Sequence, residues 1–238
     1  MLRYVNSKKM GKSDLGWLNS HFHFSFADYY NPENMNFGVL RVVNDDMVQA
    51  GKGFDTHPHR DMEIISYVIE GELTHADSMG NKHTLTRGQV QYMSAGTGVR
   101  HSEYNHGDTL LRFLQIWILP DKAGHKPNYG DFRFKIEDRE NRWLPVVTGV
   151  GNTDSAAPIR INQDINAYAT MITGGGSLDF TAASGRQAYL IMIEGSADIN
   201  GITVGMRDAL EIVEDKVSIK AGDTAHVLVI EMAKEARD

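Results

Sequence analysis

Residues 67–75 read YVIEGELTH, and a related stretch, IMIEGSADI, occupies residues 191–199. Each copy joins an apolar run to Ile-Glu-Gly and then to a second extended segment. Each is also followed by a late apolar strand, LRFLQIWIL at 111–119 in the first half and HVLVIEM at 226–232 in the second. Self-similarity of this kind indicates a duplicated structural unit. The chain is therefore predicted to contain two copies of one β unit.

The segments around these repeats are short, apolar and separated by glycine or Asn-Gly turns, which is the pattern of an all-β protein. Asn200 and Gly201, flanked by Ala-Asp-Ile and Ile-Thr-Val, predict a two-residue hairpin. Helical periodicity is weak, although short helices near residues 11–20 or in the C-terminal KEARD remain alternatives. Two units of short antiparallel strands point to a double jelly roll.

Domain boundaries are expected where the composition changes. The stretch from 121 to 158 is charged and holds three of the six prolines, which favours a linker with some local structure. We therefore expect an N-terminal domain at residues 1–120, a linker region at 121–158 and a C-terminal domain at 159–238.

The composition of the 238-residue chain excludes several classes of site. Cysteine is absent, which excludes disulfides, thiolate metal sites and cysteine nucleophiles. The formal charge of −7 disfavours direct binding of nucleic acid. The N-terminus lacks the apolar run of a secretory signal, and no segment approaches the roughly 20 apolar residues that cross a bilayer. We expect a soluble, cytoplasmic protein without membrane contact.

Two histidines stand one residue apart in FDTHPHRDMEI, at residues 54–64. In an extended segment the side chains of residues i and i+2 point to the same face, and Pro58 favours an extended residue before it. His57 and His59 would then converge, as metal–nitrogen bonds of about 2 Å require. For an isolated pair, a solvated loop is the competing interpretation.

A second motif, His101-Ser102-Glu103, repeats this spacing with a carboxylate in the second place. Across a barrel the two motifs would present three imidazoles and one carboxylate, a set that suits a divalent transition ion. Glu63 has the same parity as His57 and His59, so spacing alone permits either Glu63 or Glu103 as the carboxylate ligand. The alternative for Glu63 is a polar residue hydrogen-bonded behind a ligand.

A further histidine pair, His21 and His23, alternates with phenylalanine in HFHFSF. We interpret it as an exposed row opposite a buried phenylalanine face and as dispensable for metal binding. His75 is expected to be structural. Asp45 and Asp46 are interpreted as a turn.

Two longer stretches, GKGFDTHPHRDMEIISYVIEG at 51–71 and GQVQYMSAGTGVRHSEYN at 88–105, resemble the two motifs of the cupin superfamily. Their form is that of the pirin family of bicupins. The first follows Gly-x5-His-x-His-x3-Glu, with its last glycine one residue later than in the general pattern. The second carries Ser94 in place of proline and two extra residues before the histidine. The resemblance covers residues 17–120 closely and the remainder in outline.

This resemblance implies two cupin barrels, of which only the N-terminal one binds metal. It implies one ion per chain, held by His57, His59, His101 and Glu103, with Glu63 as a neighbour. Iron is the usual metal of the family, so Fe(II) is expected, with Ni, Cu, Co, Mn or Zn as alternatives. Bacterial members are associated with quercetin 2,3-dioxygenase activity, and mammalian members with transcriptional coregulation.

The residues of the second half agree with a metal-free C-terminal barrel. Shifted by the offset between YVIEG and IMIEG, the places of His57 and His59 fall on Thr181 and Ala183, and this half has no His-x-His motif.

The sequence thus predicts a monomeric or weakly associating bicupin that uses one ion and O2 on a small phenolic substrate such as a flavonol. Glu103, or Glu63 behind it, is the candidate base for the substrate hydroxyl. The alternative is a non-catalytic, metal-binding regulatory protein whose ligand-free second barrel binds a protein partner, as yet unidentified.

Overall fold

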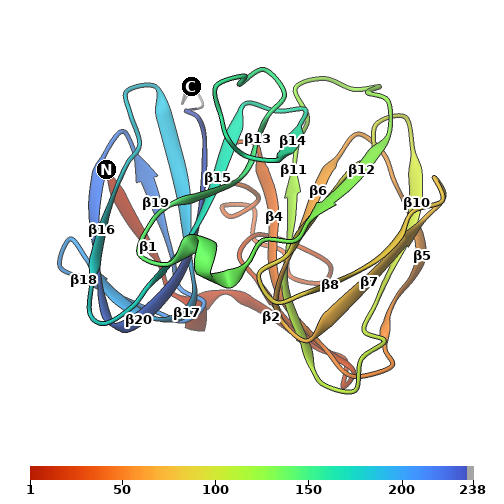
Figure 1. The fold of residues 1–238 in the computed structure, drawn as a ribbon, viewed down its shortest axis with the longest axis horizontal. Coiled ribbons are helices and arrows are strands. Elements are labelled where there is room, and N and C mark those ends of the chain that lie inside the picture. Colours follow the sequence, from red (N-terminus) through yellow and green to blue (C-terminus); the bar gives the residue numbers. More distant parts are fainter. Residues whose placement is uncertain (235–238) are drawn as a thin grey trace. The chain divides into compact units, whose positions relative to one another are not determined.

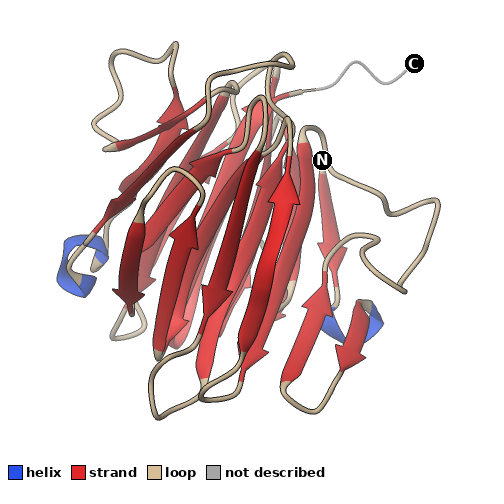
Figure 2. Ribbon diagram, turned by 90° about the vertical axis from the view of Figure 1, so that its right-hand side faces the viewer, coloured by secondary structure: helices blue, strands red, loops and turns tan. Residues whose placement is uncertain are grey.

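The computed structural model describes residues 1–234, and nearly all regular structure in that range is β-strand (Figure 2). Contacts divide the chain into two compact units. We call residues 11–135 with 161–163 the N-terminal barrel, and residues 1–10, 136–160 and 164 onward the C-terminal barrel. The predicted all-β, two-barrel architecture is confirmed. No helix among the described residues is long and apolar enough to span a membrane.

The N-terminal barrel has a seven-stranded and a four-stranded sheet (Figure 1). The larger sheet runs in the order β12 (Asn128–Phe132), β9 (Val90–Ser94), β6 (Glu63–Glu70), β11 (Leu111–Ile118), β4 (Leu40–Val48), β3 (Leu18–Phe22) and β2 (Gly11–Asp14). The smaller sheet runs in the order β5 (Gly53–His59), β10 (Val99–Tyr104), β7 (Glu72–Asp77) and β8 (Lys82–Thr86).

The interior of the N-terminal barrel has a polar layer between two apolar clusters. On β6, alternate side chains share a face, and these are Ile64, Ser66 and Val68. Ile64 belongs to one buried apolar cluster, and Val68 belongs to another that includes Phe113. The serine between them therefore lies in a layer where polar side chains meet.

The C-terminal barrel is built on one nine-stranded sheet. Its main order is β1 (Leu2–Val5), β19 (Ala209–Val213), β17 (Arg186–Ile199), β20 (Lys216–Ala233), β15 (Ile165–Ile172), β13 (Leu144–Gly149) and β14 (Ile159–Ile161). Two further strands pair with this path, β16 (Ser177–Thr181) on β20 and β18 (Ile202–Gly205) on β17. Short 3-10 helices occupy Ser7–Lys9 and Ile136–Arg139.

The Asn-Gly turn predicted from the sequence is confirmed by the backbone. Asn200 and Gly201 have φ angles of 51° and 83°, and Ile199 pairs with Ile202 on either side of them. Positive φ at both central residues is the geometry of a tight hairpin that Asn-Gly favours. In the repeated Ile-Glu-Gly, Gly71 and Gly195 have φ angles of 73° and 76°, so both copies need glycine for the same backbone reason.

The division of the structure differs from the expected boundaries. Residues 2–5 form β1, which pairs with β19 of the C-terminal barrel. The expected linker at 121–158 contains β12, on the edge of the N-terminal barrel, and β13, which pairs with β15. Charge and proline content therefore mark strands at or next to a sheet edge here. Most of residues 11–20 lies in β2 and β3 rather than in a helix, and KEARD beyond Lys234 lies outside the described residues.

Candidate metal centre and cavity

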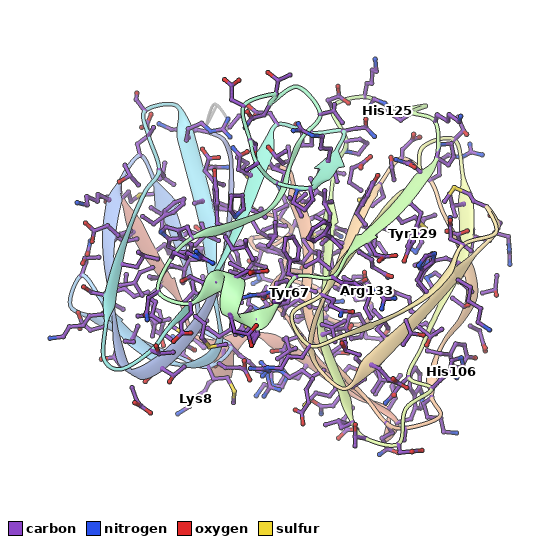
Figure 3. The ribbon with its side chains drawn as sticks, in the orientation of Figure 1. Lys8, Tyr67, His106, His125, Tyr129 and Arg133 are labelled. Carbon is purple, nitrogen blue, oxygen red and sulfur yellow. The ribbon has the colours of Figure 1, made fainter. Side chains whose placement is uncertain are left out.

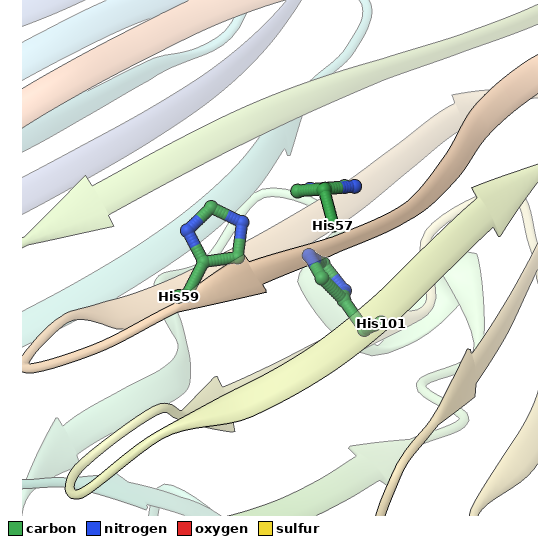
Figure 4. Close-up of side chains that lie close together, drawn as sticks. All are labelled: His57, His59 and His101. Atoms are coloured by element: carbon green, nitrogen blue, oxygen red, sulfur yellow. The ribbon is translucent and has the colours of Figure 1, made fainter.

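Strands β5 and β10 bring His57, His59 and His101 together (Figure 4). The ring centroids of His57 and His59 are 4.8 Å apart, and those of His57 and His101 are 4.5 Å apart. The rings of His59 and His101 are 4.9 Å apart. One ring nitrogen of each residue lies within 4.8 Å of the other two. Three imidazoles thus converge on one point from two adjacent strands.

The protonation of these rings suits a cation. The Nδ1 of His57 lies 2.7 Å from the carbonyl oxygen of Asp55, so it must be the protonated nitrogen, which leaves the Nε2 lone pair free. The Nε2 of His101 is buried and has no hydrogen-bond partner. Burial, together with the neighbouring histidines, lowers the pKa of His59 to about 4 and that of His101 to about 3. At neutral pH both rings are therefore uncharged and able to bind a metal.

The Glu103 carboxylate is buried, with 2% of its surface exposed, and one of its oxygens lies within 4.8 Å of a ring nitrogen of His101. Its Oε1 accepts hydrogen bonds from the Ser66 hydroxyl (2.7 Å) and the Gln91 amide (2.8 Å). Its Oε2 accepts one from the Gln115 amide at 2.5 Å. All three donors are neutral, so hydrogen bonds fix the carboxylate without neutralising its charge. A bound cation would supply the compensating positive charge, since buried charges are normally paired or coordinate metals.

The three donors come from the polar layer of the larger sheet. Gln91 on β9 is opposite Ser66 on β6, and Ser66 is opposite Gln115 on β11. On the other side, the pairing of β10 with β5 shifts register between His101 and Glu103. Such bulges change the direction of side chains and are frequent beside functional sites. Glu103 thereby lies between the histidine strands and the polar layer.

A cavity of about 290 Å³ adjoins His57, His59 and Glu103. Its apolar lining is mainly aromatic and includes Phe22, Phe26, Phe54 and Trp117. The N-terminal segment adds Ser13 and Leu15. Trp117 meets His59 edge to face with ring centroids 4.9 Å apart, and Phe26 meets Trp117 in the same way at 5.5 Å. The aromatic wall therefore reaches the histidines, and the cavity suits a flat, largely apolar molecule.

The interpretation of Asp45 and Asp46 as a turn is wrong, because β4 runs through both. Asp45 accepts hydrogen bonds from the guanidinium of Arg112 at 2.6 and 2.9 Å, whereas Asp46 lines the cavity. Burial raises the pKa of Asp46 to about 7, and the carboxylates of Asp45 and Glu103 add to this effect. An Asp-Asp pair favours turns by local preference. Only the pairing of β4 with β3 and β11 reveals that the Asp-Asp pair lies within a strand.

Glu63 lies apart from the cavity. The expectation that it shares a face with His57 and His59 assumed an unbroken strand, but β5 ends at His59 and Asp61 has a φ of 47°. Glu63 begins β6, where its parity is opposite to that of Ser66. Its Oε1 accepts hydrogen bonds from Ser94 (2.7 Å) and Asn162 (3.1 Å).

Three other histidines considered in the sequence analysis, at 21, 23 and 75, differ in their surroundings. His23 is 1% exposed, so the expected exposed row is wrong at this position, because β3 ends at Phe22 and its alternation stops there. Neither His21 nor His23 belongs to a cluster of ligand atoms in the described chain. His75 was expected to be structural, yet one of its ring nitrogens forms, with His101 and Glu103, a second group of ligand atoms within 4.8 Å.

Comparison with known proteins assigns the family. The pirin profile matches residues 4–118, and a profile described as the quercetinase C-terminal cupin domain matches residues 148–232. A pirin-like protein of Caulobacter vibrioides is 39% identical over 94% of this chain and 97% of its own. The chain belongs to the pirin family. It is also 39% identical to the quercetin 2,3-dioxygenase of Escherichia coli strain K12, over 97% of both chains.

A solved structure confirms the bicupin fold. The bacterial pirin YhhW of Escherichia coli, in complex with nickel(II), is 37% identical to this pirin and matches it with a TM-score of 0.90. The match covers 99% of this chain and 100% of that one. The protein is therefore a pirin-family bicupin that resembles quercetin 2,3-dioxygenases.

Proposed function

We propose that this pirin is a metal-dependent dioxygenase that opens the ring of flavonols such as quercetin with O2. The observation that carries the proposal is that three converging imidazoles, with the buried Glu103 carboxylate beside that of His101, meet the aromatic wall of a cavity. The relative named quercetin 2,3-dioxygenase supports this choice of reaction.

One divalent transition ion per chain would be held by His57, His59, His101 and Glu103. Three nitrogen ligands and one oxygen ligand leave positions for exogenous ligands when the ion is five- or six-coordinate. Fe(II) is our first choice, and the nickel(II) complex of the Escherichia coli pirin supports Ni(II) as the second. When bound, such an ion acidifies a hydroxyl group that coordinates it, as it does a bound water.

The ligand set favours an anionic substrate. Three neutral imidazoles and one carboxylate leave a divalent site with a charge of about +1, which one flavonolate neutralises. The rings of Phe26 and Trp117 would pack on the substrate and exclude water. The hydrogen bonds to Glu103 hold its carboxylate in place while the substrate enters. In this arrangement the protein selects the deprotonated phenol by charge and its flat ring system by shape.

Two carboxyl groups border the cavity and are candidates to accept the substrate proton. Glu103 is a proposed metal ligand with three hydrogen-bond donors. Asp46 lines the cavity with a pKa of about 7, which suits a general base near neutral pH. Glu63 is not retained as a catalytic candidate, because β6 directs it to the face opposite Ser66.

Turnover of quercetin tests the proposal. The metal-loaded protein should consume quercetin and O2 together in air, and a chelated sample should regain activity with Fe(II) or Ni(II). Under nitrogen the flavonol absorption band should shift without turnover, because coordination stabilises the deprotonated form. His101→Ala should show neither effect. A shifted band without O2 uptake, across several flavonols and metals, would contradict the enzymatic proposal and favour a regulatory protein.

A further inference from the structure

His101 has two ring nitrogens, and only Nε2 faces the proposed metal position without a partner. Its Nδ1 lies 3.4 Å from the Nδ1 of His75. The Nε2 of His75 lies 2.9 Å from Oδ2 of Asp77. A chain of three side chains therefore runs away from the metal centre, from one imidazole to a second and then to a carboxylate.

The strand register places this chain on the inner face of the smaller sheet. On β10 and β7, His101 is opposite Asp77 and Glu103 is opposite His75. The side chains of His75 and Asp77 are both fully buried. Tyr129, labelled in Figure 3 on β12, stacks on the ring of His75 with centroids 4.4 Å apart and an interplanar angle of 16°. The His75 ring is thus fixed in plane and position.

The hydrogen bonds that Asp77 accepts determine how it interacts with His75. Its Oδ1 accepts the backbone N–H groups of Met79 (2.9 Å) and Asn81 (3.1 Å), and the Asn81 amide donates to both oxygens. An ionised carboxylate held in this way can only accept hydrogen bonds. The Nε2 of His75 must therefore carry a proton and donate it to Asp77.

The remaining protons follow from this assignment. If His75 is protonated on Nε2, its Nδ1 has a lone pair and accepts the N–H of Nδ1 in His101. His101 then has its own lone pair on Nε2, which is the nitrogen directed at the metal centre. We propose that His75 and Asp77 are positioning residues that fix the metal-binding tautomer of His101.

This inference rests on the metal site of the proposed function but not on dioxygenase activity. The other arrangement of the same atoms is a second ion between His75, His101 and Glu103. That ion would require His101 to bridge two metals without a ring proton. The hydrogen-bonded chain therefore explains the geometry with fewer demands.

Asp77→Asn is the most informative variant. An asparagine amide can donate to Nε2 of His75, which would move the His75 proton to Nδ1 and the His101 proton to Nε2. Glu194→Gln is the matched control, because it removes the charged carboxylate beside a histidine of the C-terminal barrel, His226, at 2.8 Å.

Two-bond 1H–15N NMR of the full-length protein, before and after Zn(II) is added, reports the tautomer of each ring. We expect wild type and Glu194→Gln to have His75 protonated on Nε2 and His101 on Nδ1 before the metal is added. We expect Asp77→Asn to reverse both and to bind Zn(II) about 10–100-fold more weakly in competition with a chelator. Unchanged tautomers and unchanged affinity in Asp77→Asn would overturn the proposal.

A second pair of variants covers the case in which Asp77→Asn does not fold. His75→Gln keeps an acceptor for His101 and should retain most of the affinity, whereas His75→Leu removes it and should not. Equal affinities in the two variants would overturn the proposal, as would two ions per chain in the wild type that fall to one in His75→Leu. If the wild-type protein shows the expected tautomers but does not turn over quercetin, only the dioxygenase proposal is rejected.

Discussion

Ser66 and Leu190 occupy equivalent places in the two barrels, since each directly precedes one copy of the YVIEG/IMIEG repeat. Their strand partners differ in polarity in the same way. Ser66 is opposite Gln115 on β11, and Leu190 is opposite Val229 on β20. Two polar residues in the N-terminal barrel thus correspond to two apolar residues in the C-terminal barrel.

The difference extends through the interior. In the C-terminal barrel, Ala188, Leu190 and Met192 all belong to one large apolar cluster. In the N-terminal barrel, Ser66 and its neighbours interrupt the apolar packing and donate hydrogen bonds to Glu103. Strand pairing uses backbone groups, so the same frame accepts either interior. A site therefore requires changes in inward side chains rather than in the strand frame.

The largest contrast we expect is between the two candidate carboxylates of the N-terminal barrel. Glu103→Gln should weaken metal binding by more than the roughly 10–100-fold typical of losing an outer hydrogen-bond partner, because it alters a proposed ligand. Glu63→Gln should change the affinity little, since Glu63 lies on the other face of β6. Chelator competition on both variants measures this. The reverse ranking would mean that the barrel uses the carboxylate of the general cupin pattern.

Alanine at the two equivalent positions should separate packing from metal binding. Leu190→Ala should destabilise the protein by about 2–5 kcal/mol, the usual result of emptying a packed core position. Ser66→Ala should cost only about 1 kcal/mol, the net value of one hydrogen bond, and it should also weaken metal binding because Glu103 loses a donor. Denaturant titration and chelator competition give the two quantities. Equal losses of stability and of metal affinity in the two variants would contradict the comparison.

Asp46 provides a pH-dependent test of the polar interior. Its pKa of about 7 in the folded protein lies above the ordinary value, so the folded state binds the extra proton. Its contribution to stability is therefore complete below about pH 4 and is lost as the pH rises through about 7. Asp46→Asn should melt at a higher temperature than the wild type at pH 8, and the difference should shrink toward pH 4. A difference independent of pH would reject the buried, protonated carboxyl.

The smallest effect is expected for the other histidine pair of the N-terminal barrel. Replacing His21 and His23 together by glutamine should leave the metal content per chain unchanged, because neither residue belongs to a ligand cluster among the described residues. A metal content near two ions in the wild type that falls to one in this variant would contradict it.

The parts of the fold that depend on local chemistry could be predicted from the sequence. The Asn200-Gly201 hairpin follows from backbone preference at two residues, and the duplicated barrel follows from the repeat. The gathering of His57, His59 and His101 could also be anticipated, because two short motifs on extended segments already contain all three rings. These features need little knowledge of which distant strands pair.

The features that sequence reasoning missed depend on pairing between distant strands. Asp46 was mistaken for a turn residue. The link from His101 to Asp77 through His75 arises only from the register of β7 and β10. The prediction that Glu63 shares a face with His57 and His59 failed because the chain bends between β5 and β6. A local pattern contains no information on where such a bend or pairing occurs.

The central claim is that the N-terminal barrel alone holds one ion, through His57, His59, His101 and Glu103. Elemental analysis of wild type and His101→Ala, each reconstituted with Fe(II) without oxygen and then freed of excess metal, tests it most directly. We predict one ion per chain in the wild type and almost none in His101→Ala. Full occupancy in His101→Ala, or a second ion that survives in it, would contradict the account.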